Sequence, residues 1–376
     1  MEHISKHTQL PRPHAFDRYF FGIVLIISIV GLFAFTSASL GILAHSETKF
    51  YNVLFSQMVF GFVGGLLALW VGVRIPYVFW RRYAFVIFLF SLGLTLLVFV
   101  PHLGFSHGGA RRWILIGPFS LQPVELLKIG MVMYFGAWLA WARKRPNEFL
   151  YKILPLVVIL AVVAGTLLFQ PDTKSLILMA LAGAAMLFVS GVSWKKIGLI
   201  IFVIALGVTA LAFFRPYVMN RIKTFLNPSL DPQGTSYQLQ QSLIAVGSGG
   251  VFGRGLGQSV QKFNYLPEPQ GDSIFAVIAE ETGFIGSSIV VVLYVFLAIR
   301  GYKIAIQAKD TFGQYLTVGL TTLLVAQSFL NIASLIGLFP LTGVPLVFIS
   351  QGGTSFAIAL GSAGIILNVS KYRKTA

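Results

Sequence analysis

The sequence contains no cysteine, and few of its residues carry a charge. The lack of cysteine excludes disulfide bonds, Cys–zinc sites and thiol catalysis, although it leaves the redox compartment open. Charged residues make up 11% of the 376 residues, whereas 56% are hydrophobic, and apolar runs long enough to cross a bilayer recur along the chain. This composition is typical of a polytopic membrane protein.

Several common catalytic motifs are also missing. The chain has no Walker A sequence, no HExxH pair and no recognisable Ser-His-Asp grouping, and its six histidines are scattered. The net charge of +16 is large enough to suggest nucleic acid as a partner. In a membrane protein, however, basic residues mainly set the topology, so we expect no nucleic-acid binding.

The apolar runs predict an all-α fold with about ten membrane-spanning helices in one domain, residues 1–376. The runs are too long for the strands of a membrane β-barrel, and a helix satisfies all of its own backbone hydrogen bonds within the bilayer. We place the helices at residues 19–41, 53–73, 83–101, 122–142, 153–169, 175–191, 197–214, 273–299, 314–338 and 354–370.

The distribution of lysine and arginine orients these helices. If the N-terminus, the even-numbered loops and the C-terminus share one side, that side holds 18 of the 28 Lys and Arg residues. The positive-inside rule makes this side cytoplasmic, so we expect both termini in the cytoplasm. The one long loop, at about 215–272 between the seventh and eighth helices, is then extracytoplasmic.

This long loop has three recognisable parts. Residues 226–236 have the composition of turns, and residues 236–250 predict a short amphipathic helix on the membrane surface. Residues 247–257 contain six glycines in eleven positions. We interpret them as a flexible loop that approaches a substrate closely, in preference to a nucleotide phosphate cradle, because no predicted strand precedes them.

Cations also lie on the outer side, where the topology rule does not explain them. Arg111 and Arg112 lie between the third and fourth helices, and the long loop contains Arg215, Arg221, Lys223, Arg254 and Lys262. A single arginine of this kind can simply bind a lipid headgroup. Several cations beside external carboxylates instead indicate an anionic substrate, most simply a phosphate or a diphosphate.

Four of the twelve carboxylates occur within "YLPEPQGDSIFAVIAEETG", residues 265–283. Asp272 lies where the eighth helix begins, so it is a candidate N-cap as well as a candidate functional group, and the two roles can coexist. Glu280 and Glu281 lie roughly 12–13 Å deeper at 1.5 Å per residue. Ionisable groups at that depth usually face the bundle interior and pair with another group.

Other polar groups are expected at the same end of the bundle. Glu125 and Lys128 are one helical turn apart and form a candidate ion pair, with Gln122 on the same face. Asp172 lies in the tight turn "QPDTKS" between the fifth and sixth helices. The polar residues thus gather at the outer mouth of the predicted bundle.

Five linked motifs resemble those of the SEDS family, the FtsW, RodA and SpoVE group of bacteria, in order over essentially the whole chain. They are "GGARRWI…QPVELLK", "QPD", "YQLQQSLIAVGSGGVFGRGLGQSVQKFNYLPE", "DSIFAVIAEETGFIG" and "GLFPLTGVPLVFISQGGTS". The run "GRGLGQSVQK" resembles the division branch, FtsW, more than the elongation branch. The chain departs from the usual family pattern at Val124, Lys174, Gly271, Ser273 and Gln351.

The resemblance implies an inverting peptidoglycan glycosyltransferase. Such an enzyme polymerises lipid II into glycan strands at the outer face of the bacterial cytoplasmic membrane, here for the septal wall, and releases undecaprenyl diphosphate. The implied partners are lipid II, membrane lipid, a class B penicillin-binding protein that acts as transpeptidase, and divisome proteins. The alternatives are a lipid II flippase, which needs a polar path across the whole membrane, and a scaffold for a partner enzyme.

The resemblance also assigns roles to individual residues. Asp272 is the expected general base. We expect the helix N-terminus to hold it ionised, and a divalent cation, Mg²⁺ or Mn²⁺, to lie near the diphosphate at a site that the sequence does not define. Arg111 or Arg112, with Lys128, should line the same laterally open cavity as Asp272. The candidate substrate-binding residues are Arg111, Arg112, Trp113, Gln122, Glu125, Lys128, Asp172, Lys262, Glu268, Glu280 and Glu281.

Overall fold

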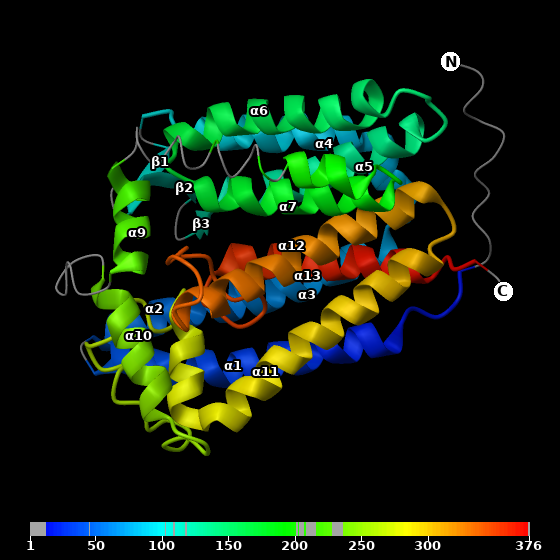
Figure 1. Cartoon of the computed structure of the whole chain (residues 1–376). Helices are drawn as coiled ribbons and strands as arrows, with labels where there is room; N and C mark the ends of the chain where they lie inside the picture. The colour runs from blue at the N-terminus through cyan, green and yellow to red at the C-terminus, as the bar shows by residue number, and fades with distance from the viewer. Residues whose placement is uncertain are drawn as a thin grey trace.

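The computed structural model describes most of the chain. The described residues are 13–44, 46–101, 103–107, 110–116, 119–200, 202, 207, 216–227 and 236–374. Their helices run roughly side by side as a bundle, with a small sheet and two short helices at one end (Figure 1). The described parts of both chain ends meet at the opposite end, where the His14 amide donates to the Lys371 carbonyl over 3.0 Å.

The fold is almost entirely helical, as the sequence predicts. The elements are α1 (Arg18–Leu43), α2 (Glu47–Ser56), the π-helix η2 (Gln57–Val63), α3 (Gly64–Arg74), α4 (Tyr77–Leu97), β1 (Gly104–His107), β2 (Ala110–Ile116), β3 (Phe119–Leu121), α5 (Pro123–Ala142), the π-helix η3 (Phe149–Ile153), α6 (Leu154–Phe169), α7 (Thr173–Val189), α9 (Pro216–Leu226), α10 (Tyr237–Ser248), α11 (Ile274–Gln307), α12 (Thr311–Leu335) and α13 (Gly353–Ser370).

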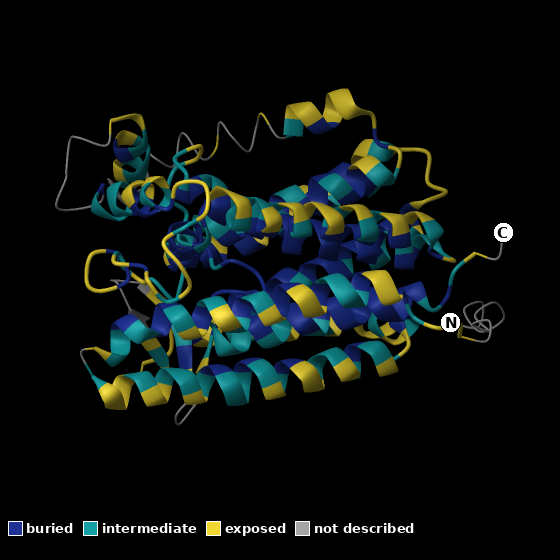
Figure 2. Cartoon of the chain, turned by 90° about the horizontal axis from the view of Figure 1, so that it is seen from below, coloured by how far each residue is buried: buried dark blue, intermediate teal, exposed yellow. Residues whose placement is uncertain are grey.

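Among the described residues, eight helical segments are long and apolar enough to cross a membrane, and α7 is a shorter apolar helix. Each predicted span coincides with a described helical segment except the seventh, 197–214, most of which lies outside the described residues. The buried faces of the helices point into the bundle, and exposed apolar residues cover its outside (Figure 2). This inversion of the usual polar surface is what a bilayer requires, because lipid solvates apolar side chains.

Helix α12 forms the centre of the bundle, and 78% of the residues in its 18-residue apolar stretch are buried. It packs against α5, α7, α11 and α13. Helices α3 and α13 approach closely through glycines: a Cβ on Gly72 would lie 2.8 Å from the Gly361 carbonyl oxygen. Small residues at such crossings let two helices pack tightly where lipid provides no hydrophobic driving force.

The non-membrane elements gather at the end of the bundle opposite the described chain ends (Figure 1). The segment around Arg111 forms a three-stranded antiparallel sheet in the order β1-β2-β3, which the all-α prediction did not anticipate. The predicted amphipathic helix is confirmed as α10, which packs on α11. The predicted turns at 226–236 lie mostly outside the described residues.

Helix α11 is broken near its start by Gly283, which has φ 67° and ψ −164°. A positive φ of this size is readily adopted only by glycine. The break leaves carbonyl groups without helical partners, and a neighbouring loop replaces those partners. The amides of Arg254 and Gly255 donate to the carbonyls of Glu280 and Glu281, each over 3.0 Å.

Candidate functional site

Asp272 lies at the end of the long loop, two residues before α11, where three other elements meet. Gln238, in the first turn of α10, donates from Nε2 to Asp272 Oδ1 over 3.1 Å. Asn331 of α12 donates from Nδ2 to the Asp272 carbonyl over 2.6 Å and to the Val344 carbonyl over 2.7 Å. Asn331 therefore holds the Asp272 backbone against the segment that connects α12 with α13.

Two cations approach the Asp272 carboxylate from separate helices. Lys174 begins α7 and donates from Nζ to the Gly343 carbonyl, and Arg221 of α9 donates to the Leu341 carbonyl over 2.6 Å. A Cβ built on Gly343 would lie 3.2 Å from Asp272 Oδ2, 3.7 Å from Arg221 Nη2 and 3.9 Å from Lys174 Nζ. The three charged groups thus surround a single glycine, where any larger residue would crowd them.

The environment of Asp272 differs from the prediction in two respects. The N-cap of α11 is Ser273, with no side-chain capping bond, and the Asp272 carboxylate accepts from Gln238 instead. The N-cap interpretation of Asp272 is therefore wrong. Burial raises the pKa of the Asp272 carboxyl above its ordinary value, and Glu268 adds to this, although Lys174, Gln238 and Arg221 oppose the rise. The shift is therefore opposite to the lowering of the pKa that a helix N-terminus was expected to cause.

A raised pKa makes a carboxylate a stronger base once it is ionised, which suits proton abstraction near neutral pH. The neighbouring Glu268 is exposed and has a positive φ of 47°. Its Oε2 lies 3.3 Å from the position of a Cβ on Gly271, so this carboxylate lies beside the loop that carries Asp272.

Arg112 and Asp172 hold the turn that positions Lys174. Arg112, half-buried on β2, donates from Nε to the Gln170 carbonyl over 3.1 Å and from Nη2 to the Pro171 carbonyl. The buried Asp172 caps α7 and accepts from the Ser175 hydroxyl over 2.8 Å. The side chains of Arg112 and Asp172 therefore form hydrogen bonds within the protein. Through this turn they connect the sheet to the Asp272 site.

The neighbours of Arg112 on β2, Arg111 and Trp113, differ in their exposure to solvent. Arg111 is exposed, whereas Trp113 is half-buried and pairs with Phe105 of β1. Lys174, Arg221, Gln238 and Asn331 were not among the predicted site residues. Two of them gave a signal in the sequence: Lys174 as a departure from the family pattern in the turn that carries Asp172, and Arg221 as one of the outer-side cations of the long loop.

The predicted pair Glu125–Lys128 is confirmed. Lys128 Nζ lies 2.8 Å from Glu125 Oε2, both side chains are buried, and Nζ also donates to Gln327 Oε1 of α12 over 2.7 Å. The three side chains line a cavity of about 40 Å³ beneath the segment 345–351. Gln122 is buried at the N-cap position of α5.

Asp272 does not line the cavity that contains Lys128. The two places are connected through α12, because Gln327 contacts Lys128 and Asn331, one helical turn further, contacts Asp272. The structure thus separates Lys128 from the arginines and Asp272, where the sequence predicted one shared cavity.

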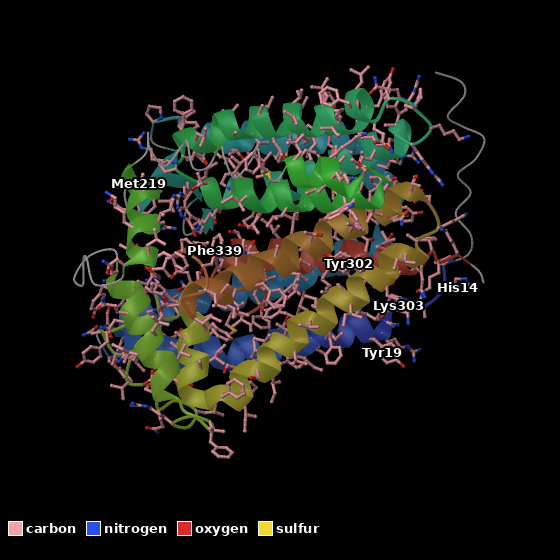
Figure 3. The ribbon with its side chains drawn as sticks, in the orientation of Figure 1. His14, Tyr19, Met219, Tyr302, Lys303 and Phe339 are labelled. Carbon is pink, nitrogen blue, oxygen red and sulfur yellow. The ribbon has the colours of Figure 1, made fainter. Side chains whose placement is uncertain are left out.

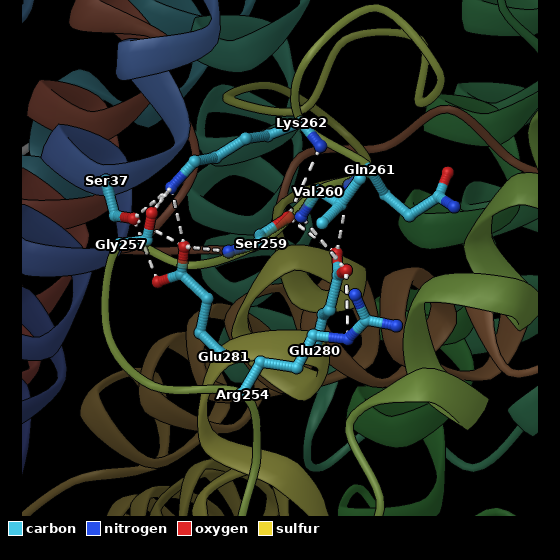
Figure 4. Close-up of polar contacts among 9 residues, drawn as sticks. All are labelled: Ser37, Arg254, Gly257, Ser259, Val260, Gln261, Lys262, Glu280 and Glu281. Carbon is cyan, nitrogen blue, oxygen red and sulfur yellow. Dashed lines mark hydrogen bonds and ion pairs between the residues drawn. The ribbon is translucent and has the colours of Figure 1, made fainter.

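Glu281 and Lys262 form a second buried ion pair, with Lys262 Nζ 2.8 Å from Glu281 Oε1 (Figure 4). The Ser37 hydroxyl of α1 donates to Glu281 over 2.6 Å, and Lys262 Nζ also donates to the Gly257 carbonyl over 2.8 Å. The lysine side chain is fully buried and the glutamate side chain is 4% exposed. This cluster joins α1, α11 and the long loop.

Glu280 lies beside this pair and holds the same loop (Figure 4). Its carboxylate accepts from the Ser259 hydroxyl over 2.6 Å and from the amides of Val260 and Gln261 over 3.1 and 3.3 Å. Arg254 Nε lies 3.7 Å from Glu280 Oε1. Hydrogen bonds from the protein itself thus satisfy Glu280, which indicates a structural role.

The glycine-rich stretch packs against α11. A Cβ on Gly253 would collide with the Glu281 carbonyl, and one on Gly249 would collide with the Ala279 carbonyl. The glycines therefore let the loop approach the backbone beside the α11 break. The close approach to a substrate stays a prediction.

A large apolar cavity of about 760 Å³ lies between α6, α7 and the segment that follows α7. Its lining includes Leu160, Ala164, Leu168 and Leu176, and also Thr173, which precedes Lys174 in the chain. The apolar cavity therefore reaches the residue next to Lys174, whose ammonium group lies near Asp272.

Among the residues that the structure describes, no three His, Cys, Asp or Glu side chains lie close enough to hold a metal ion together. Around Asp272, Lys174 and Arg221 already supply positive charge. This donor set does not fit a divalent cation held by the protein alone, and we derive no step through a metal.

Comparisons with known proteins agree on one family. The profile of the cell cycle proteins FtsW, RodA and SpoVE matches residues 17–375. The chain is 36% identical to stage V sporulation protein E of Bacillus subtilis over 94% of this chain and 96% of that protein. It is 38% identical to a probable peptidoglycan glycosyltransferase FtsW of Trichlorobacter lovleyi, over 95% and 94% of the two chains.

Solved structures show the same fold. A chain from a peptidoglycan synthase complex that coordinates polymerization and crosslinking superposes with a TM-score of 0.77 at 25% identity, covering 95% of this chain and 98% of that one. The rod shape determining protein RodA of Thermus thermophilus superposes with a TM-score of 0.70 at 24% identity, covering 96% and 99%.

Proposed function

Since this chain belongs to the FtsW, RodA and SpoVE family of cell cycle proteins, we propose that it is a peptidoglycan glycosyltransferase that builds septal wall in cell division. Its proposed substrate, as donor and as acceptor, is lipid II. The observation that carries the proposal is the meeting of Asp272, Lys174 and Arg221 around Gly343, at one end of an apolar bundle.

Asp272 is the proposed general base. Its carboxylate takes the proton from the 4-hydroxyl of the acceptor N-acetylglucosamine while that oxygen bonds to the anomeric carbon of the donor. The bond from the anomeric carbon to the diphosphate breaks, and undecaprenyl diphosphate leaves from the opposite face, with inversion. Deprotonation in step with attack is typically worth about 10²–10⁴-fold in rate. The proton then passes from Asp272 to water.

Lys174 and Arg221 are the proposed partners of the diphosphate. A leaving diphosphate gains negative charge in the transition state, and cations already held in place stabilise that charge without reorganisation. Hydrogen bonds to the Gly343 and Leu341 carbonyls hold both side chains in position. Exposed Arg111, at the rim, is suited to attract the anionic substrate.

The apolar cavity beside Thr173 is the proposed place for the polyprenyl chain. A polyprenyl tail remains in an apolar environment, whereas its diphosphate needs cations and its sugars need water. The cavity between α6 and α7 begins next to Lys174. This arrangement lets one lipid-linked molecule meet all three requirements.

We place the Asp272 end outside the bacterial cytoplasmic membrane and both termini in the cytoplasm, as the positive-inside rule indicates. A class B penicillin-binding protein is the proposed partner. The similar peptidoglycan synthase complex, which coordinates polymerization and crosslinking, supports such a pairing.

A lipid II flippase is the alternative that must be tested, because it would share substrate and fold. It requires a path across the membrane for a charged headgroup. Helices α12 and α13, at the centre, carry no charged residue, although several polar side chains of α12 are buried. The test is to incubate the purified protein, alone and with its class B transpeptidase, with labelled lipid II in detergent. Glycan strands are the expected product; their absence in both reactions would overturn the proposal.

A further inference from the structure

A cationic cavity of about 480 Å³ lies at the end of the bundle opposite Asp272, between the two described chain ends. Its lining contains the cations Arg18, Arg300, Arg373 and Lys374 and the carboxylate of Asp17. With His14 neutral, the charged lining carries a net charge of +3. His14, Tyr19 and Lys303 are all visible at this end of the bundle (Figure 3).

Buried Asp17 fixes the arginines of this cavity. Arg300 donates to its carboxylate from Nε over 3.0 Å and from Nη2 over 2.8 Å, and Arg373 Nη2 lies 3.5 Å away. Burial favours the neutral acid, but the Arg300 hydrogen bonds, the Phe20 amide and both arginine charges together lower the pKa of Asp17 below its ordinary value. The carboxylate therefore stays ionised and the arginine positions stay defined.

The backbone around the cavity is also ordered by long-range contacts. The Asp17 amide donates to Ser370 Oγ over 2.9 Å, and Arg373 pairs with Ala308 in a β-bridge. The Lys374 amide donates to the Gln307 carbonyl over 2.9 Å. The cavity is thus a site built from three separate parts of the chain, whereas topology alone requires only that basic residues lie on one side.

We propose that this cavity binds a phosphate group, namely the phosphodiester of an anionic phospholipid headgroup. Phosphate oxygens are the groups that fixed arginines bind best. The cavity lies where α1 enters the bundle, and Tyr19, 72% exposed, contacts the Arg300 guanidinium with its ring centroid 4.7 Å away. An exposed aromatic ring beside cations is typical of the headgroup level of a membrane.

The test titrates the full-length protein in detergent with dioctanoyl phosphatidylglycerol or dioctanoyl phosphatidylcholine and counts bound lipid by native mass spectrometry. Arg18→Gln with Lys374→Gln removes two exposed cations and leaves the Asp17 ion pairs intact. We expect phosphatidylglycerol to bind roughly thirtyfold more weakly to this double variant, because each charge at an anionic membrane surface is worth about fivefold.

Lys144→Gln with Lys195→Gln is the matched control. It removes the same charge from exposed positions in the predicted loops of the same side, outside the cavity, and should bind like wild type. Arg373→Gln should also weaken binding. Unchanged binding in the cavity variants, or equal binding of phosphatidylcholine, would overturn the proposal.

Inorganic phosphate added as a competitor distinguishes the two sources of the group. If phosphate leaves phosphatidylglycerol bound, the lipid headgroup is supported. If phosphate displaces the lipid at equal concentration, the lipid assignment is overturned and the cavity is a site for soluble phosphate.

Discussion

Asp272 and the pair Glu280–Glu281 lie within ten residues of one another, yet their surroundings differ in kind. Glu280 and Glu281 accept hydrogen bonds from serines and loop amides, and Lys262 neutralises Glu281 inside the protein. Asp272 is half-buried and shares the space around Gly343 with two cations from other helices.

This difference teaches how to assign roles to carboxylates in an apolar protein. A carboxylate that its own protein saturates with donors is fixed and inert, and it stabilises the fold. A carboxylate with a raised pKa beside cations that the backbone holds in position is suited to chemistry. Motif membership does not separate the two kinds, because both belong to "DSIFAVIAEETGFIG".

The largest effect is expected for Asp272→Asn. The amide keeps the shape and still accepts from Gln238, so the protein should fold and bind lipid II. Loss of the base should lower glycan synthesis by about 10²–10⁴-fold. Electrophoresis of strands made from labelled lipid II measures this. Glu148→Gln, at a partly exposed carboxylate in a predicted loop of the cytoplasmic side, is the control. Near-normal synthesis by Asp272→Asn would remove the general-base role.

Glu281→Gln should act on stability. It leaves the fully buried Lys262 without its counter-ion, and breaking a buried pair costs about 3–5 kcal/mol. Thermal or denaturant unfolding in detergent measures the loss of unfolding free energy. Glu148→Gln breaks the exposed pair with Lys196 and should cost at most about 1 kcal/mol. A Glu281→Gln protein of normal stability without activity would instead place Glu281 in the substrate site.

The Glu125–Lys128 pair is expected to have an effect on stability intermediate between those of the buried Glu281–Lys262 pair and the exposed Glu148–Lys196 pair. Lys128→Ala should destabilise the protein by about 3 kcal/mol, the low end of the range for a broken buried pair, because the cavity that adjoins Glu125 leaves this carboxylate less isolated. Glu125→Leu with Lys128→Met, which removes both charges, should restore unfolding stability. If the single variants unfold like wild type, the pair has no structural role. If the double variant is stable but inactive, the pair serves the substrate.

The smallest effect is a shift of the pH profile. Because the base must be ionised and burial raises the pKa of Asp272, activity should fall as the pH drops through that raised value. Lys174 opposes the rise, so Lys174→Gln should move the fall to higher pH, by roughly one unit. Initial rates of glycan synthesis across pH measure this. The exposed Lys195→Gln should leave the profile unchanged, and a shift to lower pH in Lys174→Gln would contradict the assigned charge interaction.

Much of the fold follows from the sequence, because helices depend on local patterns. Apolar runs of sufficient length predicted the membrane helices, and the three-residue spacing of Glu125 and Lys128 predicted their ion pair, since such residues lie on one helix face. The amphipathic segment 236–250 likewise formed α10. In each case the determining residues lie within a few turns of one another.

The tertiary structure alone decided what surrounds Asp272. Lys174 and Arg221 come from two helices far from Asp272 in the chain, and no local pattern brings them to Gly343. Asn331, from a third helix, holds the Asp272 backbone. The same holds for the glycines of 249–253, whose partner is the broken start of α11. Local sequence determined which segments form the long apolar helices and where along them the carboxylates lie. Packing between distant segments determined which carboxylate is saturated and which is available, because burial and charge depend on neighbours in space.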